Sequence, residues 1–197
     1  MDNKFIAGIV VVILIVAGVG VYFLLVNNNG NDAQEIQTFE DMKKGDYFTY
    51  TIVANIMETG DQTSTMTVTL KTVSGDNWTI ETKIVGGDEP GTTTQKMTKS
   101  EFIASLKTTE DGSSTYMYID VNNPPSDLAE LTRGTGTIHL DIGDRDDITF
   151  KGTFTNQSVS ATIDAAYSQK GVLYDVSESI TGLMTVQMTL TATSMNL

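Results

Sequence analysis

Apolar and polar residues alternate along much of the chain after residue 37. In residues 48–56, 66–70 and 184–192 every second residue is apolar, and most residues between them are threonine. Successive side chains of a strand point to opposite faces of a sheet, so the pattern predicts strands with one buried and one wet face. One-sided strands of this kind are typical of antiparallel sheets. We therefore expect a mainly β domain.

Turn-forming residues separate the alternating runs, for example Gly60-Asp61 and Gly143-Asp144. Short connections between neighbouring runs predict hairpins, and hence a meander. We expect one curved antiparallel meander sheet or partly open barrel of about eight or nine strands. The same alternation recurs in residues 78–84, 138–142, 148–154 and 159–165.

Two segments favour short helices instead. In residues 98–106 a capping-box pattern precedes apolar residues spaced three and four apart. Residues 125–133 begin with Pro-Ser-Asp and carry two leucines three apart, with Gly134 as the expected stop. Each helix would have about two to three turns and would need to pack against the sheet to be stable. We expect them to cover one opening or face of it.

The N-terminal region contains an unbroken apolar run. Residues 5–26 carry no charged side chain, and about 20 apolar residues suffice to span a bilayer as a helix. Lys4 precedes the run and polar residues follow it, which favours a cytoplasmic N-terminus by the positive-inside rule. The expected layout is a cytoplasmic tail (1–4), a single-pass membrane anchor contacting the lipid bilayer (5–26), a polar linker (27–37) and one extracytoplasmic domain (38–197).

A cleaved signal peptide is the alternative interpretation of the same run. The small residues Ala17, Gly18 and Gly20 could supply a cleavage site. However, the apolar core of a signal peptide usually has about 7–15 residues, whereas here bulky apolar residues continue to Val26. We therefore favour an uncleaved signal anchor.

Composition narrows the possible partners. The chain has 12 Lys and Arg against 25 Asp and Glu, a net charge of -13, and no cysteine. Such an acidic surface repels phosphates, which disfavours nucleic-acid binding, and its simplest role is solubility or salt tolerance. Without cysteine there are no disulfides, thiolate metal sites or cysteine nucleophiles. No cofactor is predicted.

The single histidine, His139, is the first candidate for catalysis. It shares the polar side of its strand with Asp141, and the pair could join a serine in a hydrolytic triad. The chain contains no G-x-S-x-G nucleophile elbow. A solvated strand histidine explains the position without any chemistry, so we do not expect an enzyme.

An acidic cluster is the weak candidate for a metal site. Asp141, Asp144, Asp146 and Asp147 could offer oxygen ligands to Ca²⁺. The cluster lacks the ligand spacing and the distal Glu of an EF-hand, and Arg145 lies within it. A polar hairpin loop is the preferred interpretation.

Two N-x-[ST] sequons are present. Asn156 lies in an expected turn and is the better glycosylation candidate, and Asn77 is the second. Both depend on the domain being outside the cell in an organism that glycosylates asparagine.

Methionine and aromatic residues on the apolar strand faces raise the possibility of a ligand cavity. Met66, Trp78, Phe150 and Met184 are the candidates to line it. Methionine also fills cores adaptably, which explains these residues without a ligand. Nevertheless, barrels of about eight strands can hold one small ligand.

The anchor, the opening KGDYFTY of residues 44–50 and the lack of cysteine resemble a loose group of archaeal surface proteins, in which an N-terminal anchor precedes a threonine-rich β domain. That group implies no activity for particular residues. The expected curved meander with helices over its mouth, and the turn at residues 170–174, are also similar to lipoprotein-carrier half-barrels. The chain departs from them in having no lipid-attachment cysteine.

Three classes of function stay open. The leading hypothesis is a membrane-anchored envelope domain that acts by interaction, with an envelope protein or glycan as partner and no catalysis. The alternative is a carrier or sensor of a small apolar, lipid-like ligand inside the curved sheet. An enzyme is the third, and a pilin-like subunit is disfavoured because no processing site stands directly ahead of Phe5.

Overall fold

A computed structural model describes residues 38–57, 60–87, 90–108, 116–156 and 159–195 of the chain. The expected cytoplasmic tail, anchor and linker, residues 1–37, lie outside these ranges. Within them, none of the helices has both the length and the apolar character that crossing a bilayer requires.

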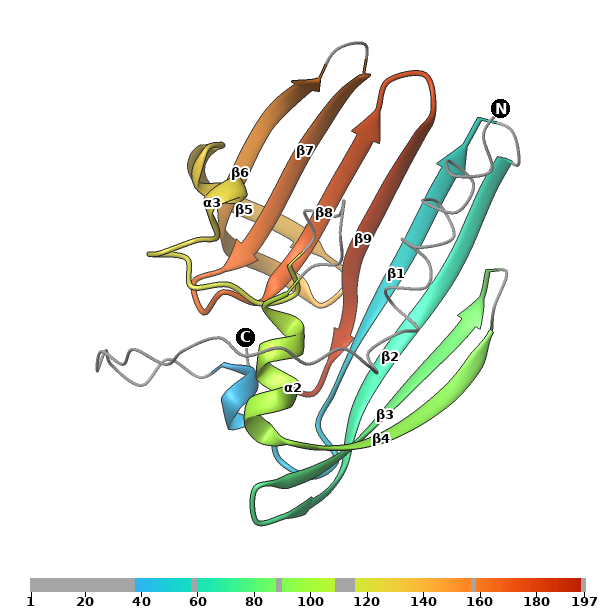
Figure 1. Cartoon of the computed structure of the whole chain (residues 1–197), viewed down its shortest axis with the longest axis vertical. Coiled ribbons are helices and arrows are strands. Elements are labelled where there is room, and N and C mark those ends of the chain that lie inside the picture. Colours follow the sequence, from blue (N-terminus) through green and yellow to red (C-terminus); the bar gives the residue numbers. More distant parts are fainter. Residues whose placement is uncertain (1–37, 58–59, 88–89, 109–115, 157–158, 196–197) are drawn as a thin grey trace.

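The described residues form one antiparallel sheet of nine strands (Figure 1). The strand number and the antiparallel pairing confirm the expectation from alternation. Consecutive strands from β1 to β4 lie side by side in the sheet, and so do those from β5 to β9. Each of these two sets of strands is therefore a meander. The strands are β1 (Tyr47–Ile56), β2 (Gly60–Ser74), β3 (Asn77–Gly86), β4 (Gly91–Thr98), β5 (Thr132–Leu140), β6 (Gly143–Asn156), β7 (Val159–Ser168), β8 (Leu173–Ile180) and β9 (Met184–Thr193).

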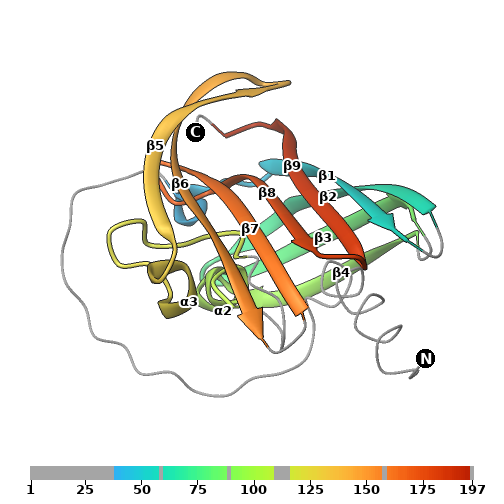
Figure 2. The same cartoon turned by 90° about the horizontal axis from the view of Figure 1, so that it is seen from above.

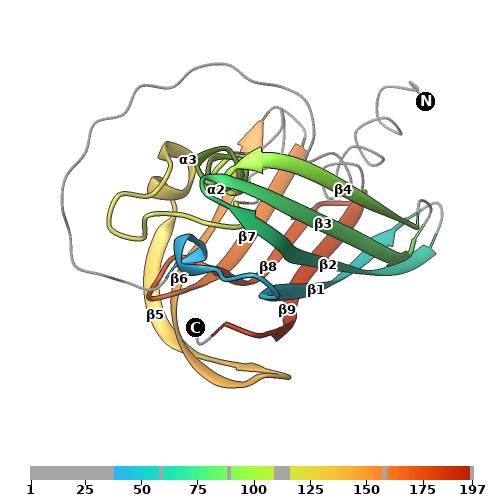
Figure 3. The ribbon, with the colours of Figure 1, turned by 90° about the horizontal axis from the view of Figure 1, so that it is seen from below.

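The first and last strands join the two meanders at the centre of the sheet. The strand order is β4-β3-β2-β1-β9-β8-β7-β6-β5, with β1 and β9 antiparallel. Because β4 and β5 end the order without pairing with each other, the sheet is open rather than a closed barrel. It curves strongly into a half-barrel when seen along its strands (Figures 2 and 3).

Three short helical segments accompany the sheet: η1 (Phe39–Asp41) and α2 (Lys99–Leu106) lie toward its lower end, and α3 (Ser126–Ala129) lies beside β5 and β6 (Figure 1). Helix α2 has the predicted capping box: the Glu101 amide donates to the Thr98 hydroxyl at 3.2 Å, and the Thr98 amide donates to the Glu101 carboxylate at 2.6 Å.

The second predicted helix is shorter than the sequence suggested. It ends at Ala129, and Gly134 lies inside β5 instead of stopping a helix. The reason is tertiary: Thr149 on β6 packs so closely that a Cβ on Gly134 would lie 2.7 Å from its hydroxyl. Pairing with β6 therefore places in strand β5 the last residues that the local pattern assigned to the helix.

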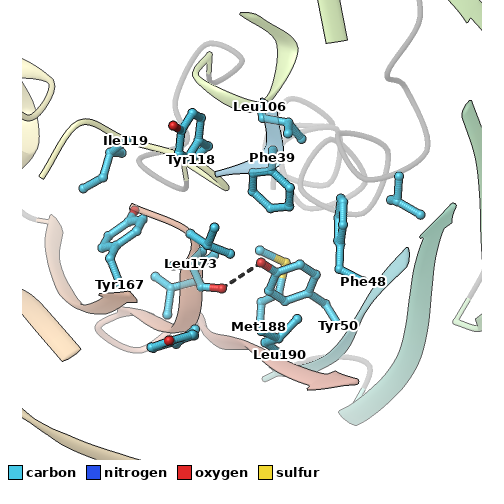
Figure 4. Packing of buried hydrophobic residues seen from close by; sticks show 14 of the residues in the cluster. Phe39, Phe48, Tyr50, Leu106, Tyr118, Ile119, Tyr167, Leu173, Met188 and Leu190 are labelled. Atoms are coloured by element: carbon cyan, nitrogen blue, oxygen red, sulfur yellow. Dashed lines mark hydrogen bonds between the residues drawn. The ribbon is translucent and has the colours of Figure 1, made fainter. Parts of the chain in front are cut away.

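The core lies between the lower half of the sheet and these segments. Phe39 of η1 packs against Phe48 of β1 and Tyr118, with ring centroids 4.8 and 5.6 Å apart (Figure 4). On the other side of the core, Trp78 of β3 packs against Phe102 of α2 at 5.8 Å. Together these segments form a plug in the lower concave side: η1, α2 and residues 116–128.

Candidate functional site

The concave side of the sheet has ranks of apolar side chains that run across the strands. Strand register places one residue each from β6, β7, β8, β9 and β1 side by side in a rank. From the upper edge inward, the outer rank is Phe154, Ala161, Ile180, Met184 and Ile56; the middle rank is Gly152, Ile163, Glu178, Val186 and Ala54; the inner rank is Phe150, Ala165, Val176, Met188 and Ile52.

Exposure rises from the inner rank to the outer one. Every inner-rank residue is at most 8% exposed and belongs to the core. In the outer rank, all residues except Ile56 are half-buried. We call the outer and middle ranks together the upper concave face. It is an apolar surface above the plug, with a partly accessible rim.

Met57 and Leu183 lie at the upper edge of the sheet. The Met57 amide donates to the Leu183 carbonyl at 3.2 Å, which ties the end of β1 to the β8–β9 turn. Met57 is 77% exposed, the largest exposure among the large apolar residues of the described ranges.

The sequence-predicted cavity residues divide between core and rim. Met66, Trp78 and Phe150 are at most 4% exposed and are packed by neighbouring side chains, so they do not line an accessible surface. Only Met184 lies in the upper concave face. The sequence missed Phe154, Ile180 and Val186 as site residues. Alternation already placed Phe154 and Val186 on apolar faces, whereas Ile180 lies outside the alternating runs.

Two buried tyrosines lie where the upper concave face meets the plug. The Tyr50 hydroxyl donates to the Leu173 carbonyl at 2.7 Å (Figure 4), and the Tyr167 hydroxyl donates to the Tyr116 carbonyl at 3.0 Å. Burial raises the pKa of both phenols far above the ordinary value of 10.0. Both therefore remain neutral donors, and their hydroxyls already have acceptors within the protein.

One charged residue stands in the upper concave face. Glu178 of β8 is half-buried and lies between Ile163 of β7 and Val186 of β9 in the middle rank. Its charge contributes, after burial, to the raised pKa of Tyr167.

His139 is part of an exposed ion pair at the other end of the molecule. Its Nδ1 lies 2.7 Å from the Asp144 carboxylate, and register pairs the two residues directly across β5 and β6. The partner is thus Asp144, not the Asp141 that the sequence suggested. The hydrogen bond raises the pKa of His139, which is fully exposed.

The four aspartates of the acidic cluster do not converge. Asp141 lies in the turn between β5 and β6. Along β6, Asp144 and Asp146 point to one face of the sheet and Asp147 points to the other. Asp147 is buried, and its Oδ1 lies beside Gly136 without a hydrogen-bond partner in the described ranges. Those ranges contain no group of three or more His, Asp or Glu placed to hold a metal ion.

The two glycosylation candidates lie at strand ends. Asn77 begins β3 and is exposed. Asn156 ends β6, and its side chain is outside what the structure describes. Both sequons stay predictions.

A separate open pocket of about 570 Å³ lies beside α2. Its lining includes Glu40, Asp76, Lys99 and Lys107, and it contains none of the residues predicted from the sequence. The two lysine amines lie over aromatic rings of the plug, at 5.9 Å from Trp78 and 4.7 Å from Tyr118. The lysines therefore serve the packing of the plug.

No family model and no curated protein match the chain. Among solved structures, a protein described as exported with a YmcC-like fold, from Bacteroides fragilis, matches with 8% identity and a TM-score of 0.41 over 78% of this chain and 97% of that one. A lipoprotein from Parabacteroides distasonis has 10% identity and a TM-score of 0.39, over 82% and 100%. An outer-membrane lipoprotein-sorting protein domain from Vibrio parahaemolyticus has 10% identity and a TM-score of 0.25, over 80% and 89%.

The third of these proteins is described as lipoprotein-sorting, which agrees with the fold-level likeness to lipoprotein-carrier half-barrels, whereas the archaeal resemblance gains no support. All three TM-scores lie below 0.5, so these likenesses are too remote to carry an argument about function. Any proposal must therefore come from the geometry of the upper concave face.

Proposed function

We propose that this protein is a non-catalytic, extracytoplasmic half-barrel that binds a small apolar, lipid-like ligand along its upper concave face, held at the membrane by residues 5–26. The observation that carries the proposal is the outer rank of half-buried apolar residues above a filled core. A soluble domain that needed only a stable core would have no use for this second, accessible apolar surface inside its curvature.

Energetics favour a ligand with a long apolar chain. Each buried methylene contributes about 0.8 kcal/mol, and association costs on the order of 4–15 kcal/mol. A chain of roughly ten or more methylenes is therefore needed before apolar burial alone gives useful affinity. The outer rank offers such a chain a continuous surface, because its apolar residues follow one another across all five strands.

The absence of catalysis is part of the proposal. The only histidine of the chain, His139, is exposed on the β5–β6 hairpin and paired with Asp144, far along the sheet from the outer rank. The positions of the ranks supply no pair of nucleophile and base.

A matched pair of variants tests ligand binding. The full-length chain, reconstituted in zwitterionic lipid nanodiscs, is labelled with a photoreactive long-chain alkanol, and unlabelled dodecan-1-ol competes. Val186→Gln places an amide in the middle rank, which should weaken competition at least about fivefold because a polar group would lie unpaired beneath the chain. Thr185→Gln, one residue earlier and on the opposite face of β9, should change it less than about twofold.

Labelled peptides should come from β8, β9 and the β1–β2 hairpin. Equal competition in both variants, or labelling confined to the convex face, would contradict the proposal. The domain would then act through its surface alone, with an envelope protein or glycan as partner.

A further inference from the structure

We propose that strand β4 is an interface at which two copies of this chain pair antiparallel, with Gln95 of one copy facing Gln95 of the other. Such pairing would use backbone groups at the edge of the sheet and would need no ligand. It is therefore separate from ligand binding in the upper concave face.

The outer side of β4 has no neighbouring strand. In the described part of the chain β4 pairs with β3 alone and lies at the end of the strand order (Figure 1). Most of its side chains are exposed, so no described segment covers this edge. The backbone N–H and C=O groups that point away from β3 are therefore available to a further strand.

β4 also lacks most of the features that block an edge against pairing. Its pairing with β3 has an unbroken register, and its sequence GTTTQKMT contains no proline and one charged residue, Lys96. The opposite edge, β5, is a poorer template, because Gly134 and Gly136 leave gaps among its side chains and the strand bends strongly (Figure 2). Of the two edges, β4 is thus the one suited to pairing.

The charge of the strand favours a second copy of this chain as its partner. The chain has a net charge of -13, so two copies repel each other in most approaches. β4 contains one Lys and no Asp or Glu, which makes it an edge where two such acidic molecules can meet with little repulsion. Antiparallel pairing of a strand with its own copy also closes after two subunits.

The side chains of β4 complement those of a second β4 in one register. With Gln95 at the two-fold axis, Lys96 lies opposite Thr94 of the second copy, and Met97 lies opposite its Thr93. The two glutamine amides face each other and can exchange hydrogen bonds. Lys96 and Met97 therefore each have a smaller, neutral neighbour across the interface.

The neighbouring registers are less favourable because of charge. A shift that centres the pair on Thr94 would place Lys96 opposite Thr92, whose other neighbour is Lys83 of β3. A shift that centres it on Lys96 would oppose the two lysines directly, and like charges directly opposite are destabilising. In the proposed register Lys96 instead faces Thr94, whose other neighbour is Glu81, a residue that already forms an ion pair within the sheet.

Pairing along one strand would join two sheets of nine strands into a single sheet. A contact confined to one strand is small beside the roughly 1,200–2,000 Å² of stable interfaces, so it should form where copies are concentrated. The proposed anchor would confine the copies to one membrane. The two-fold axis of an antiparallel pair is perpendicular to its strands, so both chains can enter the same bilayer when β4 lies along the membrane surface.

Introduced cysteines test the pairing, because the chain has none of its own. Full-length Gln95→Cys and Thr93→Cys are reconstituted in phosphatidylcholine vesicles and oxidised with copper phenanthroline. Two Cα atoms at the centre of the pair would lie about 4.5–5.5 Å apart, within reach of a disulfide. Two copies of position 93 would be offset by about 13 Å along the strands, beyond that reach. Gln95→Cys should form the linked dimer at least about tenfold faster.

Exposure makes Thr93→Cys a stringent control. Thr93 is exposed and Gln95 is half-buried, so random collisions between copies would link Thr93→Cys faster, which is the opposite order. Both positions are on the same face of β4, two residues apart, and neither side chain is charged.

Charge at position 94 tests the register. In the Gln95→Cys protein, Thr94→Glu would place a carboxylate opposite Lys96 on both sides of the axis and should speed linking at least about threefold. Thr94→Lys would oppose lysines and should slow it by a similar factor. Within one copy the effects run the other way, because Thr94 faces Glu81 of β3. A change in strand stability alone would therefore favour the lysine variant.

Two results would overturn the interface. If Thr93→Cys links as fast as Gln95→Cys or faster, β4 does not pair with its own copy in the membrane. If linking through Gln95→Cys is faster with Thr94→Lys than with Thr94→Glu, it follows the stability of the strand rather than contact between copies.

Discussion

Tyr50 and Tyr167 are the two tyrosines of the core that are fully buried and donate to a backbone carbonyl of another segment. Tyr50 joins β1 to Leu173 of β8, which is remote in sequence and next to it only through β9. A buried hydrogen bond of this kind contributes about 1 kcal/mol, and losing the donor leaves the carbonyl less well satisfied. The two phenols therefore fix how the sheet curves against its plug.

These phenols should make the protein sensitive to alkali. Their pKa values are raised in the folded state, mainly by burial, so at high pH only the unfolded chain releases the protons. The stability they contribute is complete below the ordinary tyrosine pKa of 10.0 and is lost progressively as pH rises above it. Urea unfolding between neutral pH and about pH 11 should show a steep decline.

Tyr50→Phe should be about 1 kcal/mol less stable at neutral pH, yet its decline above pH 10 should be shallower by about 1 kcal/mol per pH unit. Ile52→Val, which loses a comparable amount of stability without an ionisable group, should decline as steeply as the unaltered protein. An equal slope in all three would show that Tyr50 ionises freely in the folded state.

Residues 116–121 of the plug cross the lower concave side and are bonded to both α2 and the sheet. The Tyr118 amide donates to the Leu106 carbonyl of α2, and the Ile119 amide to the Gly171 carbonyl, each at 3.0 Å. Tyr118 also bridges to Val172 in antiparallel fashion. This crossing segment therefore pairs over a short length with the β7–β8 turn and closes the lower end of the concave side.

Gly171 is the residue that makes this close crossing feasible. Its φ is +80°, and a Cβ at this position would lie 1.9 Å from the Ile119 carbonyl oxygen. Gly171→Ala should thus destabilise the fold by well over the roughly 1 kcal/mol that positive φ alone costs. Gly182→Ala is the matched control, because its φ is +72° and nothing lies within 4 Å of an added Cβ.

Thermal unfolding of the two glycine variants measures the difference directly. We expect the midpoint of Gly171→Ala to fall clearly below that of Gly182→Ala. Equal midpoints would mean that the crossing segment moves aside at little cost and does not hold the lower end closed.

The pairing of β1 with β9 makes one cooperative unit of two meanders. Without it, β1–β4 and β5–β9 would be separate sheets joined only through the plug. The core crosses this seam, since Tyr50 and Ile52 of β1 lie beside Leu190 and Met188 of β9. Unfolding of one meander therefore exposes the core of the other.

A variant in one meander should consequently destabilise the other. The single tryptophan, Trp78, is in β3 and reports the first meander, while Ile148→Ala creates a cavity in β6 of the second. Such a substitution costs about 2–5 kcal/mol, which corresponds to at least about 5 °C in the unfolding midpoint. Trp78 fluorescence and far-ultraviolet circular dichroism should shift together. If the fluorescence transition stayed in place, the meanders would unfold independently.

Much of the sheet could be predicted from the sequence, because the physics involved is local. The two-residue period decides which side chains share a face, so Phe48, Met66 and Met184 were correctly placed on apolar faces. Turn residues indicate where one strand of a hairpin ends and the next begins. The Thr98–Glu101 capping box marks the start of α2. The second helix was predicted too long because pairing of β5 with β6 outweighs a weak local preference.

The candidate site depended on the tertiary structure. Alternation repeats identically along a strand, so it cannot tell a residue beneath the plug from one above it. Met66, Trp78 and Phe150 became core because η1, α2 and residues 116–128 cover the lower half, while Met184 remained at the rim. The pairing of β1 with β9 likewise joins segments about as far apart as the domain allows. The sequence by itself determined which side chains face inward; only the folded arrangement decided which of them are covered, because the covering segments come from distant parts of the chain.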